Sequence, residues 1–281
     1  MRTEIEIIEV HASHGGVQEV YRHASTQLRC DMVFSVFTPP QAAQRPCPVV
    51  IYLSGLTCTH ANVTEKGEYR RVASELGLII VCPDTSPRGE HVPDDPAYDF
   101  GQGAGFYLDA RRAPWAESFR MESYVVDELN ALIAEHFNVD PNRQAIMGHS
   151  MGGHGALTLA LRCPGRWRSV SAFSPIVAPS QVPWGRKAFQ GYLGDDEASW
   201  ADYDAVALVQ AGRRLPEPLI DVGEADPFLE RELKPELFEA ACRAAGQPLT
   251  LRRHAGLDHS YYFVSTFMAD HLRWHAQRLS A

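Results

Sequence analysis

The sequence predicts an α/β fold in which helices cover both faces of a mostly parallel sheet. Short, continuous apolar runs, such as residues 48–53 and 78–82, are typical of strands buried on both faces of a parallel sheet. Segments with helical periodicity alternate with these runs along the chain. This alternation of strands and helices builds a parallel sheet between two helical layers.

The first elements follow from pattern and punctuation. Residues 28–37 alternate loosely between apolar and polar side chains, and a Pro-Pro pair ends this predicted strand. Strand 48–53 follows it. A helical pattern then covers residues 65–76, and Gly77 stands where a glycine commonly closes a helix. Strand 78–82 comes next and stops at a proline.

Residues 85–114 are rich in Gly, Pro and Asp and show little periodicity. A stretch of this length without regular structure is usually a functional excursion or a poorly ordered loop. Its aromatic residues favour an ordered excursion. A helix is predicted near residues 118–137, directly after it.

The second half of the chain repeats strand and helix. Residues 175–194 interrupt this order, and we expect an irregular insertion there that contains Trp184. No internal repeat, low-complexity tract or linker is visible, so one domain over residues 1–281 is predicted. The remaining predicted strands are 144–147, 168–173, 218–223 and 249–253, and the remaining predicted helices are 153–161, 230–245 and 261–279.

Composition excludes several classes of protein. A net charge of −9 argues against nonspecific binding to nucleic acid or to an anionic membrane. No apolar run reaches the length of a membrane span, and the first residues lack the apolar core of a secretion signal, so the cytoplasm is the expected location. The six cysteines are scattered without a C-x-x-C pair, which predicts free thiols rather than a zinc site or a disulfide framework.

The segment Gly148–Gly152 reads as a nucleophile elbow. It follows a predicted buried strand and precedes a helix of small residues. Ser150 on such a turn takes a strained conformation with positive φ, and glycines two residues before and after it avoid collisions across the turn. The alternative is a glycine-rich turn whose serine only caps the helix.

A serine nucleophile needs a base, and that base needs an acid that holds its tautomer. In an α/β-hydrolase both partners follow the serine, each in a loop after a later strand. Asp226 and His259 occupy such loops, after strands 218–223 and 249–253. Other residues compete for these roles: Glu224 and Asp258 as the acid, with Asp221 poorer because it lies within a strand, and His254 as the base.

The remaining parts of the predicted site are two backbone donors. Met151, directly after the nucleophile, should supply one N–H of an oxyanion hole, and Leu56, in the loop after strand 48–53, should supply the other. The alternative for that loop is an ordinary turn. His149 and His154 are expected to point away from Ser150, and no metal-binding spacing is present, so neither a metal nor a cofactor is expected.

With these residues identified, the chain resembles the S-formylglutathione hydrolases of the esterase D family. The resemblance extends from about residue 17 to the C-terminus. It departs from the family pattern at residues 60–63, Pro227 and Leu257, which places the differences at the expected pocket rim. The matching segments are residues 53–59, 83–89, 98–107, 148–157, 183–189 and 258–263.

The resemblance implies hydrolysis of S-formylglutathione to formate and glutathione, a step of formaldehyde removal. It places Ser150, Asp226 and His259 at the family's triad positions, Leu56 and Met151 at its oxyanion donors, and Cys58 beside the active site. It also implies a homodimer that acts on a small molecule.

Substrate preference is less determined by the sequence. We expect Trp184 and Phe106 to crowd the acyl side of the pocket, although core packing explains such aromatics equally well. A general short-chain carboxylesterase on the same fold is the alternative enzyme. A catalytically inactive binding protein on this fold is a further alternative, which the intact triad argues against.

Overall fold

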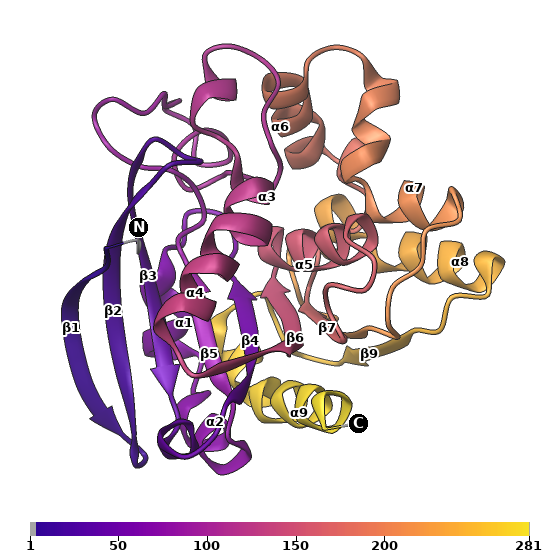
Figure 1. Cartoon of the computed structure of the whole chain (residues 1–281). Coiled ribbons are helices and arrows are strands. Elements are labelled where there is room, and N and C mark those ends of the chain that lie inside the picture. The colour runs from indigo at the N-terminus through magenta and orange to yellow at the C-terminus, as the bar shows by residue number, and fades with distance from the viewer. Residues whose placement is uncertain (1–3, 281) are drawn as a thin grey trace.

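A nine-stranded sheet runs through the protein, seen in a computed structural model that describes residues 4–280 (Figure 1). The strand order is β1-β2-β3-β5-β4-β6-β7-β8-β9. The strands are β1 Glu6–Ser13, β2 Gly16–Ser25, β3 Cys30–Thr38, β4 Cys47–Leu53, β5 Ile79–Pro83, β6 Val139–His149, β7 Ser169–Phe173, β8 Leu219–Gly223 and β9 Thr250–His254.

The sheet is antiparallel at its N-terminal side and parallel elsewhere. The pairs β1–β2, β2–β3 and β3–β5 are antiparallel, and every pair from β5–β4 to β8–β9 is parallel. The mostly parallel α/β sheet that the sequence predicts is therefore confirmed. All five strands from β4 to β8 point their C-terminal ends toward the same edge, where the loops after them meet.

Helices cover both faces of the sheet. The helices are α1 His60–Lys66, α2 Arg70–Leu76, α3 Met121–Ser123, α4 Asn130–His136, α5 Met151–Arg162, α6 Pro183–Leu193, α7 Ala205–Gln210, α8 Pro235–Ala245 and α9 Tyr261–Leu279. Two π-helical segments cover Tyr124–Leu129 and Leu229–Leu233, and short 3₁₀ helices cover Pro40–Ala43, Trp115–Glu117, Pro179–Gln181 and Glu197–Tyr203.

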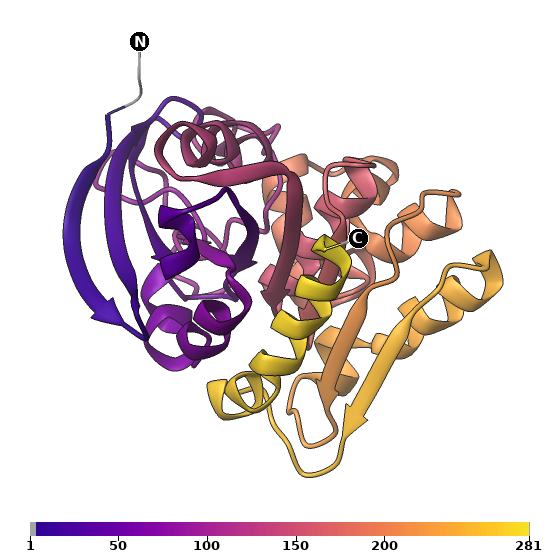
Figure 2. The ribbon, with the colours of Figure 1, turned by 60° about the horizontal axis from the view of Figure 1, so that its bottom comes forward.

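The core is split by the sheet into two apolar layers. Val50 and Tyr52 of β4 pack with α1, α2 and α9 on one face, whereas Val49, Ile51 and Leu53 pack with α4 to α8 on the other. Figure 2 shows α9, in yellow, lying on the same side of the sheet as the purple helices. Burial of every second residue on each side explains why the strand reads as a continuous apolar run. No helix among residues 4–280 is long and apolar enough to cross a membrane.

A chain of hydrogen bonds fixes α9 to the sheet. His271 Nε2 lies 3.2 Å from Asp221 Oδ2, and its Nδ1 lies 2.8 Å from Ser171 Oγ. His275 continues the chain, with Nε2 and Nδ1 each 2.8 Å from Ser171 and Ser169 Oγ. Burial lowers the pKa of both histidines, so both rings are neutral. Each ring then donates from Nε2 and accepts a serine hydroxyl at Nδ1.

The insertion at residues 175–194 was predicted to be irregular, and this prediction was wrong for its second half. Residues Pro183–Leu193 form α6, whose Trp184, Ala188 and Phe189 are buried. Glycines within the segment weaken its helical signal. One of them, Gly191, is required by packing, because a Cβ there would lie 2.2 Å from the Phe100 ring.

Two predicted helices are each divided by a residue with positive φ. The helix expected at 65–76 is split into α1 and α2, and Glu68 between them has φ +54°. The helix expected at 230–245 is split at Lys234, whose φ is +47°, because Pro235 cannot continue a helix from the preceding turn. By contrast, the predicted helix at 261–279 matches α9 at both ends.

Candidate active site

Ser150 lies on a strained turn between β6 and α5. Its φ and ψ are +59° and −118°, a conformation that costs a non-glycine residue about 1–3 kcal/mol. The turn is pressed against the end of β4: a Cβ at Gly152 would lie 1.9 Å from the carbonyl oxygen of Leu53. A backbone strained in this way and packed against its neighbour holds the serine in one orientation.

Asp226 and His259 meet beside this turn. Asp226 follows β8 and His259 follows β9, and their Oδ2 and Nδ1 atoms are 2.5 Å apart. The Asp226 side chain is fully buried, and its other carboxylate oxygen accepts a hydrogen bond of 2.8 Å from the Phe228 N–H. Because the carboxylate engages Nδ1–H, the neutral imidazole keeps Nε2 free to accept a proton. His259 and Ser150 line the same pocket.

The competing acids have other partners. The Asp258 carboxylate accepts bonds from the Ser260 N–H and hydroxyl, which lower its pKa. Asp221 is engaged by Arg252 and His271. The Glu224 side chain is exposed, and its N–H donates to the carbonyl of His254. Among the acids weighed, Asp226 is the one that contacts His259.

The two histidines that flank the serine differ. His154 points away, as predicted: its Nε2 lies 3.0 Å from the carbonyl oxygen of Phe106, and burial lowers its pKa to about 4. His149 instead lines the pocket around Ser150. His149 ends β6 and packs against the loop that carries His259, with ring centroids 4.5 Å apart. Burial, followed by the nearby His259, keeps the pKa of His149 well below its usual range, so a neutral ring supports the imidazole.

Side chains from the irregular segment 85–114 hold the loop after β4 in place. The carbonyl oxygen of Cys58 accepts bonds of 2.6 Å from Thr85 Oγ1 and 3.0 Å from Arg88 Nη2. Arg88 is itself fixed by Asp84, at 2.9 Å. Within the described part of the chain the Leu56 N–H makes no hydrogen bond, so it is free to bind an oxyanion. Met151 begins α5, where N–H groups have no intrahelical partner.

We expect Arg88→Met to lower kcat about tenfold with little change in KM. The substitution removes one of the two donors to Cys58 O, so the loop that carries the Leu56 N–H is held less firmly, and one oxyanion donor is worth more than this when lost entirely. The measurement is steady-state hydrolysis of a p-nitrophenyl ester. Arg29→Met is the control, because Arg29 pairs with Glu117 on an exposed surface. An unchanged kcat in Arg88→Met would contradict this role.

The pocket around Ser150 has a volume of about 290 Å³. One wall is aromatic. Trp184 Nε1 donates a hydrogen bond of 3.0 Å to Tyr98 Oη. The ring centroid of Phe228 lies 4.7 Å from that of Trp184 and 5.0 Å from that of His259. The lining residues are Gly55, Leu56, Thr57, Cys58, Asn62, Tyr98, His149, Ser150, Trp184, Phe228, His259 and Tyr261.

Of the three residues that the sequence placed at the pocket, Cys58 and Trp184 line it and Phe106 does not. Trp184 and Cys58 line the pocket, and burial raises the pKa of the Cys58 thiol, which is therefore protonated near neutral pH. Phe106 is fully buried and lies outside the lining, because its ring packs near His154 in the core. Reasoning from the sequence did not place Phe228 and Tyr98 in the pocket, although Phe228 follows Asp226 closely and Tyr98 begins one of the segments that match the family.

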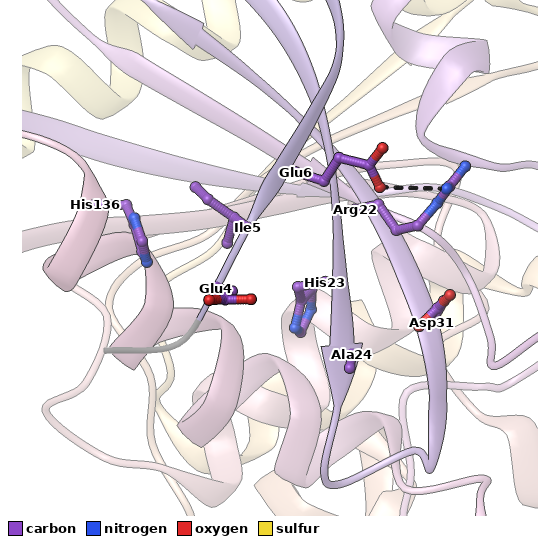
Figure 3. Close-up of a pocket in the computed structure, with 8 residues that line it drawn as sticks. All are labelled: Glu4, Ile5, Glu6, Arg22, His23, Ala24, Asp31 and His136. Atoms are coloured by element: carbon purple, nitrogen blue, oxygen red, sulfur yellow. Dashed lines mark hydrogen bonds and ion pairs between the residues drawn. The ribbon is translucent and has the colours of Figure 1, made fainter. Parts of the chain in front are cut away.

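A larger hollow of about 770 Å³ lies at the other end of the sheet, beside β1, β2 and α4 (Figure 3). Two of its lining residues, Arg22 and Glu6, form an ion pair of 3.3 Å. It contains neither a nucleophilic serine nor any residue of the predicted triad. Within residues 4–280, no group of three or more His, Cys, Asp or Glu side chains is placed to hold a metal ion.

The chain matches one protein family, and its fold is similar to that of several solved structures. Residues 25–274 match the family described as "Putative esterase". An S-formylglutathione hydrolase from Agrobacterium tumefaciens is 59% identical, with 97% of this chain and 99% of that chain covered and a TM-score of 0.96. A Staphylococcus aureus S-formylglutathione hydrolase is 17% identical, covering 98% and 100% of the two chains with a TM-score of 0.71, which shows a shared fold.

Proposed function

The chain belongs to the esterase family and is a serine hydrolase, and we propose that it cleaves S-formylglutathione into formate and glutathione. The choice of substrate is supported by the 59% identity to the Agrobacterium hydrolase over nearly the whole of both chains. The chemistry is supported by one observation above all: the His259–Asp226 hydrogen bond lies in the pocket that holds the strained Ser150.

In the proposed mechanism the Ser150 hydroxyl attacks the thioester carbonyl carbon while His259 Nε2 takes its proton. Asp226 stabilises the imidazolium that forms. The N–H groups of Leu56 and Met151 bind the developing oxyanion, each contributing about 3 kcal/mol to barrier lowering. The C–S bond then breaks, His259 gives its proton to the leaving sulfur, and glutathione departs as the thiol. His259 activates a water molecule that attacks the formyl-enzyme, and formate is released.

A small acyl group fits the proposed site. The aromatic wall formed by Tyr98, Trp184 and Phe228 is tied together by a hydrogen bond and a ring contact, so it resists displacement. A pocket of about 290 Å³ must also admit the thiol part of the substrate. These walls favour formyl and acetyl groups over longer chains. The homodimer and the cytoplasmic location remain predictions.

The function is tested by comparing kcat/KM for three substrates. We expect S-formylglutathione to exceed p-nitrophenyl acetate by at least about tenfold, and p-nitrophenyl hexanoate to fall at least about tenfold below the acetate, because each misfitting methylene costs binding to the transition state. Acetate turnover equal to or above that of S-formylglutathione would instead identify a general short-chain carboxylesterase. Equally fast hexanoate turnover would show that the aromatic wall does not limit acyl size.

A further inference from the structure

A second hollow adjoins the pocket around Ser150. It has a volume of about 590 Å³ and lies between the end of α1 and the start of α9. Tyr261 lines both spaces, so the two lie next to each other at this residue. The other hollows beside β1 and β2 share no residue with the pocket around Ser150. The lining residues are Lys66, Glu68, Ser260, Tyr261, Tyr262 and Ser265. We call this space the α1–α9 groove.

The α1–α9 groove presents one positive and one negative side chain without partners. Lys66 and Glu68 are exposed, and within the described residues neither makes an ion pair or a side-chain hydrogen bond. Two other basic side chains already have acidic partners: Lys187 lies 2.5 Å from Asp99, and Arg111 lies 3.1 Å from Asp202. Because the chain has a net charge of −9, a lysine side chain beside the pocket that is unpaired within residues 4–280 indicates a place where a negatively charged group can bind.

The charge of Lys66 reaches the wall of the pocket around Ser150. Burial raises the pKa of the Cys58 thiol, and the Lys66 ammonium acts in the opposite direction. Asn62, one turn before Lys66 on α1, lines that pocket and accepts a bond of 2.9 Å from the Thr59 N–H through its Oδ1. Its side-chain NH₂ group therefore stays available to a substrate carbonyl.

The shape of the site separates the two ends of a thioester. The aromatic wall with Trp184 lines one part of the pocket, whereas Tyr261, which also lines the pocket, borders the α1–α9 groove. Tyr262 is 86% exposed at the groove and offers a ring face to a peptide. A tripeptide spans about 10 Å when extended, so its charged ends reach beyond the pocket in which its thioester reacts.

We propose that the α1–α9 groove binds the peptide part of the thioester, with Lys66 pairing with a substrate carboxylate and Glu68 with the substrate ammonium. The proposal rests on the proposed function, because glutathione carries two carboxylates and one ammonium group. It assigns the leaving thiol to the Asn62 side of the pocket and the acyl group to the Trp184 side.

The test is charge reversal at Lys66. We expect Lys66→Glu to lower kcat/KM for S-formylglutathione at least about tenfold, through KM, and to leave p-nitrophenyl acetate within about twofold, because the acetate ester has no charge to lose. Arg243→Glu is the matched control: it makes the same change in net charge at an exposed position on α8, and both substrates should be unaffected.

A second variant tests the opposite charge. Glu68 has φ +54°, so Glu68→Asn removes the carboxylate with a residue that tolerates this conformation. We expect a severalfold rise in KM for S-formylglutathione and no change for its derivative acetylated on the γ-glutamyl nitrogen. Thermal unfolding of each variant checks the fold.

The outcomes separate this proposal from the proposed function. If the wild-type protein fails to hydrolyse S-formylglutathione, the proposed function is wrong. If the wild type hydrolyses it and Lys66→Glu retains full kcat/KM, the enzyme stands and the α1–α9 groove is not the peptide site. An equal loss on both substrates would also overturn the proposal, since it would show general damage to the pocket.

Discussion

Ser150→Ala is expected to lower kcat by about 10⁴-fold or more, because it removes the hydroxyl that forms the acyl-enzyme, while burial keeps the Cys58 thiol of the same pocket protonated near neutral pH. Any residual hydrolysis would come from the oxyanion donors and from substrate binding. The measurement is hydrolysis of S-formylglutathione and of p-nitrophenyl acetate under single-turnover conditions. Activity that survived the substitution would remove Ser150 from the mechanism.

The same position offers a control for folding. Alanine keeps the strain of a positive φ, whereas glycine relieves it, so Ser150→Gly should raise the free energy of unfolding by about 1 kcal/mol while it abolishes activity. A variant that is inactive and more stable than the wild type cannot have lost activity through misfolding. A loss of stability in Ser150→Gly would show that the serine side chain supports the turn instead.

Asp221→Asn is expected to lower the free energy of unfolding by about 3 kcal/mol, since it removes the fully buried member of an ion pair. The Asp221 carboxylate is fully buried and lies 2.6 and 2.5 Å from two nitrogens of Arg252. His271 adds a bond of 3.2 Å, and His254 Nε2 lies 3.3 Å from Oδ1. Denaturant unfolding at neutral pH measures the change.

The matched control is Asp270→Asn. Asp270 pairs with the same Arg252 at 3.2 Å, but its side chain is half exposed, so its loss should cost less than about 1 kcal/mol. Equal effects of the two substitutions would show that the buried pair has no special weight. Because Asp221 lies outside the pocket, kcat should be retained by Asp221→Asn below its unfolding temperature.

The contribution of Asp221 also depends on pH. Burial alone would raise the pKa of this carboxyl, but hydrogen bonds from Arg252 and His271 outweigh burial and hold the pKa well below its usual range. The stabilisation is therefore complete above the unfolded-state pKa of about 3.9 and is lost as the pH falls below it. The difference in stability between wild type and Asp221→Asn should shrink between about pH 4 and pH 2.

Local sequence patterns predicted the strands that are buried on both faces of the sheet. The apolar runs of β4 and β5 lie between two helical layers and so carry no polar face, which made them visible as strands. α6 was missed for the opposite reason. Its glycines lower helical propensity, and they are present because α6 packs closely on residues from the distant excursion, including Phe100.

Asp221 is a second residue whose role local sequence patterns did not predict. Its place within a strand made it a poor candidate for the catalytic acid, and it does not contact the catalytic histidine. The residues next to Asp221 in the sequence did not indicate an ion pair, because its partners Arg252 and His271 lie on other elements. The contact of His149 with His259 was not predicted for the same reason, since it joins the end of β6 to a loop more than one hundred residues further along the chain.

The sequence by itself determined the α/β class, the family and the residues from which a catalytic triad could be chosen. These follow from short-range rules: apolar runs, strand–turn–helix spacing and glycines around a strained serine. Only the tertiary structure decided which acid meets His259, that Phe106 belongs to the core, and that Lys66 and Glu68 face a groove beside the pocket. Such choices depend on contacts between distant loops, and no local pattern records them.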